Sequence, residues 1–154
     1  MRIKTNKKAP NFKLDSTASK PFELSKLKNA LIVYFYPKDN TPGCTLETKD
    51  FSKLYKRFKS LKYEVVGISK DDIKSHLGFK KKYKVPFQLL SDEKVQVQKK
   101  YGVWGMKSFL GKKFMGTIRS TIAINKHGKI LRVWSNVRVK NHAQEVLDFV
   151  KSQK

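Results

Sequence analysis

Cys44 is the only cysteine in this 154-residue chain, and the residues before it favour thiolate chemistry. It follows an apolar run, residues 30–36, and a polar turn, residues 37–43, and an amphipathic segment begins beside it. This order predicts a buried strand, a short loop and a helix whose first turn carries the thiol. A helix start offers unpaired N–H groups and the positive end of a dipole, which favour a thiolate over a thiol. A lone cysteine is more often an inert core residue, but a core cysteine needs no Thr-Pro-Gly turn before it.

The three residues that directly precede Cys44 fit the beginning of that helix. Thr41 can be the cap, Pro42 suits the first helical position, and Cys44 then falls at the third. In this register the Thr41 hydroxyl lies near the sulfur, where it either caps the helix or hydrogen-bonds a bound molecule. Pro37, at the end of the predicted strand, can shield one side of the sulfur from water.

Arg119 is the candidate cation of the site. It lies in a β-branched strand, residues 116–124, on the face opposite its isoleucines, where a guanidinium needs an anionic partner or a wet cleft. We expect it to lie over Cys44 and to hold the thiolate; an edge-strand arginine that reaches solvent is the alternative. Glu47, one turn after Cys44, would oppose ionisation of the thiol. We therefore expect Glu47 to face and orient an arginine or lysine, and a carboxylate that only meets the helix dipole is the alternative.

The histidines offer no metal or acid–base signal. His76, His127 and His142 fall in a helix, a turn and a helix start, and their spacing is not that of metal ligands. We expect no metal site and no catalytic histidine.

The segments that must position these residues alternate between strands and helices. Strands are predicted at 30–36, 63–69 and 87–90, with helices from 42 to 61, from the Ser69, Asp71 or Asp72 cap to 83, and from 91 to 101. An N-terminal hairpin is predicted at 11–14 and 21–24, a second hairpin at 117–125 and 129–137, and a last helix from about 141. Residues 102–116 contain four glycines and no sustained period, so we expect a long aromatic loop there. The pattern predicts one α/β domain over residues 1–154, a central mixed sheet flanked by helices.

The charge of the chain suggests nucleic-acid binding, but its distribution does not. The net charge is +23, and 30 of the 35 basic residues are lysines spread from Lys4 to Lys154. Arginine reads phosphates and base edges better, and the chain has five. We expect a solvated lysine-rich surface with weak, salt-sensitive attraction to polyanions and no specific nucleic-acid partner; a polyanion-binding protein is the rival hypothesis.

The apolar segments predict no membrane partner. The longest apolar run is far shorter than the roughly 20 residues that cross a bilayer, and the basic start shows no secretory signal pattern. A single cysteine forms no internal disulfide, so we expect a cytoplasmic protein.

The spacing Pro37-x-x-x-Thr41-x-x-Cys44 resembles the active-site signature of the peroxiredoxins, and Arg119 in Arg-Ser-Thr is similar to that family's active-site arginine. Residues 9–12 resemble the opening of the family, and residues 36–45, 69–72, 86–92 and 101–105 resemble its Q-type, or bacterioferritin comigratory protein, branch. The resemblance implies a thioredoxin-like fold and a thiol peroxidase that reduces hydrogen peroxide and organic hydroperoxides without a metal or organic cofactor. Cys44 would be the peroxidatic nucleophile. Thr41, Arg119 and the amides of Gly43 and Cys44 would bind the peroxide oxygens.

The chain departs from this branch at the position of its resolving cysteine. Lys49 stands five residues after Cys44, where many Q-type members have a second cysteine. A sulfenic acid on Cys44 must therefore be resolved by an outside thiol: thioredoxin, glutathione with glutaredoxin, or another protein's cysteine. A redox sensor or relay that uses the same cysteine is the alternative function. Met106 also departs from the acidic residue common in relatives, and we attach no consequence to it. We expect a monomer, with a weak dimer as the alternative.

Overall fold

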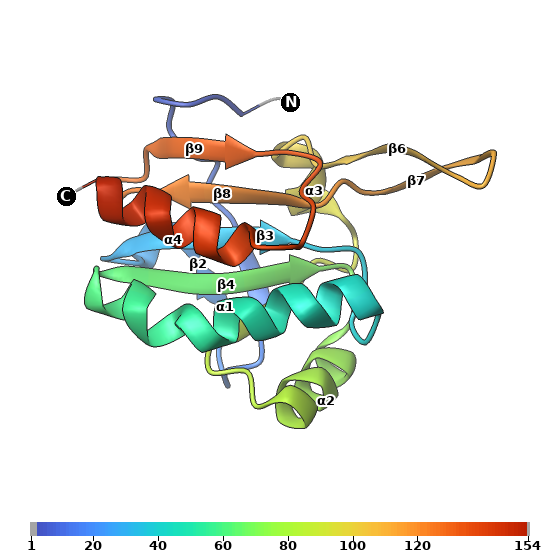
Figure 1. Ribbon diagram of the computed structural model, residues 1–154, viewed down its shortest axis with the longest axis horizontal. Coiled ribbons are helices and arrows are strands. Elements are labelled where there is room, and N and C mark those ends of the chain that lie inside the picture. The colour runs from blue at the N-terminus through green and yellow to red at the C-terminus, as the bar shows by residue number, and fades with distance from the viewer. Residues whose placement is uncertain (1–2, 154) are drawn as a thin grey trace.

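A seven-stranded mixed sheet forms the centre of the computed structural model, which describes residues 3–153 (Figure 1). Met1, Arg2 and Lys154, which the single-domain prediction includes, lie outside the described residues. The strand order is β2-β1-β5-β4-β3-β8-β9. The strands are Lys13–Ser16 (β1), Phe22–Glu23 (β2), Ala30–Phe35 (β3), Tyr63–Ser69 (β4), Gln88–Ser91 (β5), Ser120–Ile124 (β8) and Ile130–Trp134 (β9). Strands β3, β4 and β5 are parallel to one another, and the other pairs are antiparallel.

Strand β3 lies inside the protein because both of its faces are apolar. All six of its residues are buried, and alternate side chains enter two different hydrophobic clusters. Helices α1 (Pro42–Ser60), α2 (Ile73–Tyr83) and α4 (His142–Ser152) contribute to the first cluster. Helix α3 (Gln96–Lys100) and the N-terminal segment cover the second. The predicted central sheet flanked by helices is confirmed, as is the hairpin of β1 and β2.

A glycine in β4 makes room for the side chain that seats α1. Gly67 pairs with Tyr34 of β3, and a Cβ at Gly67 would lie 2.7 Å from the tyrosine ring. The Tyr34 hydroxyl lies 2.8 Å from the Thr48 hydroxyl in α1. The helix that carries Cys44 is therefore held by a buried hydrogen bond one turn beyond the cysteine.

The prediction of a loop over 102–116 is wrong. These residues form a separate hairpin of β6 (Trp104–Phe109) and β7 (Lys112–Thr117), which extends beyond the end of the main sheet (Figure 1). Its turn is Leu110–Gly111, with φ of 51° and 79°. Both central residues have the positive φ of the turns that match the twist of a two-stranded ribbon.

Two other predicted boundaries are also corrected. The strand expected at 116–124 is divided, because Thr117 ends β7 and β8 begins only at Ser120. The helix expected from residue 91 is the short α3, because Asp92 first accepts hydrogen bonds from the N–H groups of Val97 and Gln98 across a turn. Within residues 3–153, no helix is both long enough and apolar enough to cross a membrane.

Candidate active site

Cys44 occupies the third position of α1, as predicted. Thr41 is the residue before the helix, with extended φ and ψ of −84° and 153°, and Pro42 begins the helix. The Thr41 side chain makes no capping hydrogen bond; its hydroxyl donates to the Lys38 carbonyl at 2.9 Å. Of the two roles predicted for this hydroxyl, the cap is therefore wrong. The first-turn N–H groups are not satisfied by Thr41, and its oxygen keeps lone pairs that can accept a hydrogen bond.

The sulfur of Cys44 lies beside a guanidinium and a buried carboxylate. Arg119 Nη2 is 3.3 Å from Cys44 Sγ, and Arg119 Nη1 donates to Glu47 Oε1 at 2.6 Å. Cys44 and the Glu47 side chain are each 1% exposed, whereas the Arg119 side chain is 17% exposed. The arginine lies in the two-residue link between β7 and β8 and reaches back to α1. Residues that are 72 and 75 positions apart in sequence thus meet at one point.

Gly43 provides the space for this contact. A Cβ at Gly43 would lie 3.3 Å from Arg119 Nη2, tighter than most such contacts, so the guanidinium would have to shift by a few tenths of an ångström. Pro37 is half-buried where the loop leaves the buried Tyr36, at the position from which shielding of the sulfur was expected. The predicted residues Pro37, Thr41, Gly43 and Glu47 therefore belong to one loop-and-helix segment, and Arg119 comes to it from the link just before β8, the strand that pairs with β3.

The ionisation of the site is governed by burial and by Arg119. Burial raises the pKa of Glu47 to about 7, although the Arg119 charge and hydrogen bond oppose this. Burial would lower the pKa of Arg119, but Glu47 and Cys44 outweigh it and the pKa is raised. The guanidinium is thus a permanent cation next to the sulfur. Lys107 of β6 is a second cation nearby: burial and Arg119 lower its pKa, while Cys44 raises it.

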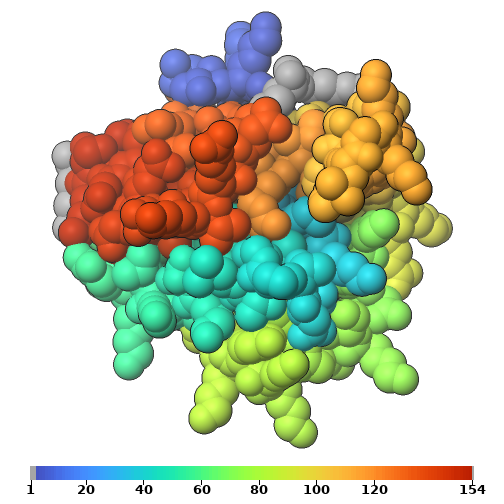
Figure 2. Space-filling view, turned by 45° about the vertical axis from the view of Figure 1, so that its right-hand side comes forward, coloured from blue at the N-terminus to red at the C-terminus, as the bar shows by residue number. Residues whose placement is uncertain are grey.

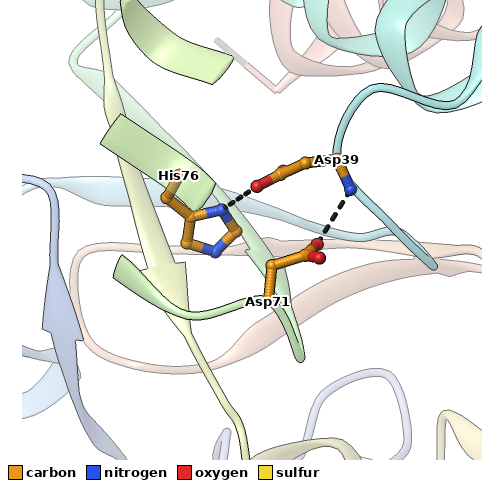
Figure 3. A group of neighbouring side chains, drawn as sticks. All are labelled: Asp39, Asp71 and His76. Carbon is orange, nitrogen blue, oxygen red and sulfur yellow. Dashed lines mark hydrogen bonds and ion pairs between the residues drawn. The ribbon is translucent and has the colours of Figure 1, made fainter. Parts of the chain in front are cut away.

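Asp39 is a buried residue of this loop that the sequence analysis did not single out. Its carboxylate accepts hydrogen bonds from the Tyr36 hydroxyl at 2.6 Å and the Ser75 hydroxyl at 2.8 Å. His76 Nδ1 lies 2.7 Å from Asp39 Oδ2 (Figure 3). His76 Nε2 lies 2.9 Å from the Leu90 carbonyl, so both ring nitrogens face acceptors. His76 therefore bridges Asp39 and the Leu90 carbonyl, and these contacts tie the loop before Cys44 to α2 and β5.

Asp39, Asp71 and His76 are also the described residues closest to a metal-ligand arrangement. Their ligand atoms lie within 4.8 Å of one another. Figure 3 shows that these groups point toward one another, with the Asp39 N–H donating to Asp71 Oδ2 at 2.8 Å. Asp71 Oδ2 also accepts from the Ser69 hydroxyl at 2.6 Å. A cation would have to displace these donors, so the arrangement is that of a hydrogen-bond network.

The chain is similar over most of its length to known proteins of one family. The AhpC/TSA family profile matches residues 5–133. The chain is 40% identical over 152 residues to peroxiredoxin Bcp of Bacillus subtilis, with 98% of this chain and 97% of that protein covered. It is 43% identical over 148 residues to putative peroxiredoxin bcp of Coxiella burnetii, with 96% and 98% covered.

Solved structures give the same result for the fold. A cysteine-to-serine mutant of Xylella fastidiosa PrxQ superimposes with a TM-score of 0.92 and 33% identity, covering 98% of this chain and 97% of that one. A Xanthomonas campestris bacterioferritin comigratory protein, whose structures concern its alkyl peroxide reduction activity, gives a TM-score of 0.87 at 33% identity, with 92% and 91% covered.

Proposed function

This chain belongs to the AhpC/TSA family, in which its relatives are peroxiredoxins of the Bcp/PrxQ type with a thioredoxin-like fold, and it is a thiol-dependent peroxidase; we propose that Cys44 is its peroxidatic residue and that it works by a one-cysteine mechanism. The observation that carries this assignment is the contact of 3.3 Å between Cys44 Sγ and the Arg119 guanidinium. A permanent cation in contact with a cysteine sulfur favours the thiolate, which is the form that attacks peroxides.

The proposed oxidation step forms one S–O bond and breaks one O–O bond. The Cys44 thiolate attacks the terminal oxygen of a hydroperoxide, ROOH, and becomes the sulfenic acid Cys44–S–OH. The electron pair of the O–O bond leaves on RO⁻, which takes a proton from water to give ROH or, from hydrogen peroxide, water. Sulfur is oxidised and the peroxide is reduced, so no metal or organic cofactor enters the step.

Three groups beside the sulfur have geometry suited to this displacement. Arg119 can donate to the leaving oxygen while it contacts the sulfur, and this is the place where negative charge develops. Unused N–H groups at the start of α1, including those of Gly43 and Cys44, supply further donors. Because the Thr41 hydroxyl donates to Lys38, its oxygen is left to accept the O–H hydrogen of the incoming peroxide.

Glu47 and Pro37 are proposed to support the site without touching the reacting oxygens. Glu47 holds the second guanidinium nitrogen of Arg119 at 2.6 Å and so fixes the direction of the first. Pro37 is proposed to limit the access of water at the start of the loop.

Reduction of the sulfenic acid is proposed to use an external thiol. Lys49 is exposed on α1, at the position of the resolving cysteine in Q-type members, and Cys44 is the chain's only cysteine. A thiol R′SH attacks the sulfur and gives a mixed disulfide, Cys44–S–S–R′, and water. A second thiol then attacks the sulfur bonded to R′, forms a disulfide with it, and releases Cys44 in its reduced form. Thioredoxin and glutathione with glutaredoxin are the two proposed reductant systems.

The decisive experiment is peroxide consumption by the wild-type protein and the Cys44→Ser variant, with dithiothreitol as the reductant. We expect the variant to lose turnover, and mass spectrometry of dimedone-treated wild-type protein to find the sulfenic adduct on Cys44. Ser52→Ala, two turns along the same helix, is the matched control that should keep the rate. Unchanged turnover in Cys44→Ser would refute the assignment, and an oxidised Cys44 without sustained turnover would favour the redox relay instead.

We further propose that residues 1–154 act as one domain, in the cytoplasm, and as a monomer. The main sheet includes strands from β1 to β9, which supports a single unit. A single cysteine forms no internal disulfide, which fits a reducing compartment, and mutual repulsion at a net charge of +23 opposes self-association. Sedimentation velocity at low and high salt tests the monomer against the weak dimer.

A further inference from the structure

Exposed apolar side chains are concentrated on the β6–β7 hairpin. Five of the seven large hydrophobic residues that are exposed among the described residues lie there: Met106, Phe109, Leu110, Phe114 and Met115. In Figure 2 the hairpin (orange) stands out from the surface on the same side of the molecule as the light-blue segment that leads into α1. Contiguous exposed apolar surface of this kind marks a contact site more often than scattered single residues do.

The two faces of this hairpin are not equivalent. Lys107 pairs with Phe114 and Phe109 pairs with Lys112, and directly paired residues point to one side of the ribbon. We call these four residues the inner face. Lys107 is half-buried, whereas Met106 and Ser108 on either side of it are exposed, so the inner face is the one turned toward the body of the protein. The charges of Arg119 and Cys44 both act on the pKa of Lys107, which agrees with this orientation toward the sulfur.

The opposite face offers a matched control. Met106 pairs with Met115, and Ser108 pairs with Lys113. The exposed fractions of the two methionines, 61% and 50%, are close to those of Phe109 and Phe114, 54% and 46%. The two faces therefore expose similar apolar residues but differ in their orientation relative to Cys44.

The tip of the hairpin is costly for an isolated protein. Leu110 is 91% exposed and has φ of 51°, a left-handed conformation that asparagine or glycine adopts more easily than leucine does. Solvation and backbone preference both disfavour leucine here. Contact with a partner would bury this side chain and offset the cost.

The hairpin is continuous with the candidate active site. Strand β7 ends at Thr117, and Arg119 follows two residues later. The link is held firmly, because the Ile118 N–H donates to the Val103 carbonyl at 2.7 Å. A protein bound to the inner face is thereby placed next to the sulfur that an external thiol has to reach.

We propose that the inner face of the β6–β7 hairpin, together with Leu110, docks an acidic protein dithiol reductant with an apolar surface around its reactive thiol. This proposal rests on the proposed function, since it names the partner of the same Cys44. Charge complementarity selects the occupant: Lys107 and Lys112 border the phenylalanines, and the chain as a whole carries +23, which favours an acidic partner and disfavours a second copy. In the docked complex one partner thiol displaces water from Cys44–S–OH to form the mixed disulfide, and its second thiol releases reduced Cys44.

The test compares two double variants with two reductants. Peroxide turnover is measured with reduced thioredoxin, an acidic protein dithiol, and separately with dithiothreitol, which needs no docking surface. For Phe109→Ser/Phe114→Ser we expect the KM for thioredoxin to rise about tenfold or more, and turnover with dithiothreitol to stay unchanged. The control Met106→Ser/Met115→Ser should keep both values. Added salt should raise the KM for thioredoxin in the wild-type protein.

Each other outcome overturns the proposal or its premise. An equal rise of KM in both double variants, or in neither, means that the inner face is not the docking surface. Turnover with dithiothreitol but not with thioredoxin excludes the acidic dithiol partner. If the wild-type protein is a dimer and only Phe109→Ser/Phe114→Ser dissociates it, the inner face binds a second copy of this chain and not a reductant. Absence of turnover with dithiothreitol in the wild-type protein would instead refute the proposed function itself.

Discussion

Replacement of Arg119 by alanine tests whether the guanidinium acts on the sulfur or only on the fold. The side chain makes two charged contacts, with Cys44 Sγ at 3.3 Å and with Glu47 Oε1 at 2.6 Å. A hydrogen bond to a charged group contributes about 1.5–3 kcal/mol, which corresponds to about 10- to 160-fold in rate if it acts in the transition state. We therefore expect peroxide consumption with dithiothreitol to fall by at least about tenfold.

The same variant should lose stability in a pH-dependent way. Removal of one partner from a buried ion pair costs about 3–5 kcal/mol while the other stays charged, and Glu47 is 1% exposed. The pKa of Glu47 is already about 7 with Arg119 in place, above its ordinary value of 4.5. Between pH 4.5 and about 7 the folded state binds the Glu47 proton more tightly than the unfolded state does. The contribution of Glu47 to stability therefore falls as pH rises through this interval, by about 3 kcal/mol in all. Without Arg119 this loss should extend to higher pH, so urea unfolding should show a larger deficit at pH 8 than at pH 6.

A companion substitution separates the two effects. Glu47→Gln added to Arg119→Ala removes the buried acid, so most of the lost stability and the extra pH dependence should be recovered. The rate should stay low, because the guanidinium is still absent from the sulfur. Recovery of the rate together with the stability would refute the reasoning, since Arg119 would then serve only to neutralise Glu47.

Three further predictions concern the loop and helix around the sulfur. Thr41→Val should keep the fold, since its hydroxyl caps nothing, and should lower the peroxide rate about tenfold; an unchanged rate in stopped-flow traces would exclude the hydroxyl from the reaction. Asp39→Asn should lower the urea-unfolding free energy by about 3 kcal/mol. Burial opposes ionisation of Asp39, but contact with His76 prevails and lowers the pKa of Asp39. The wild-type protein therefore loses this stabilisation as pH falls through the lowered pKa, and the unfolding free energy of the variant should depend less on pH in the acid range. Lys49→Cys should form an intramolecular disulfide with Cys44 only after α1 unwinds, since helical Cα atoms five residues apart are about 8.6 Å from each other; loss of far-ultraviolet helix signal on oxidation checks this, and a disulfide without it would contradict the prediction.

The sequence predicted the main sheet because its strands and helices are separated by strong local signals. Strand β4 was predicted with its observed bounds, 63–69, since apolar side chains are bracketed by a helix end and by capping residues. The β6–β7 hairpin was missed because apolar residues occur on both of its faces, so the two-residue alternation is absent, and because Leu-Gly is not a usual hairpin turn.

The site was predictable to the extent that its residues are close in sequence or belong to a known motif. Thr41, Gly43, Cys44 and Glu47 lie within seven consecutive residues. The arginine was singled out by its place opposite the isoleucines of a β-branched segment and by its Arg-Ser-Thr context. Asp39 looked like a polar turn residue, because only the fold brings His76, 37 positions later, against it. A polar residue three positions after a buried tyrosine is a weak signal, and neither composition nor spacing strengthens it.

The near-complete enclosure of Cys44 has a consequence for the order of events in a catalytic cycle. At 1% exposure, the sulfur can be approached by a two-oxygen oxidant beside Arg119, but a protein thiol meets the first turn of α1 before it meets the sulfur. On the proposed mechanism, we expect each oxidised molecule to wait until that turn opens, and a second oxidant to compete with the reductant during the wait. We therefore expect the opening rate of a single helical turn to limit how much peroxide the protein tolerates before Cys44 is oxidised irreversibly.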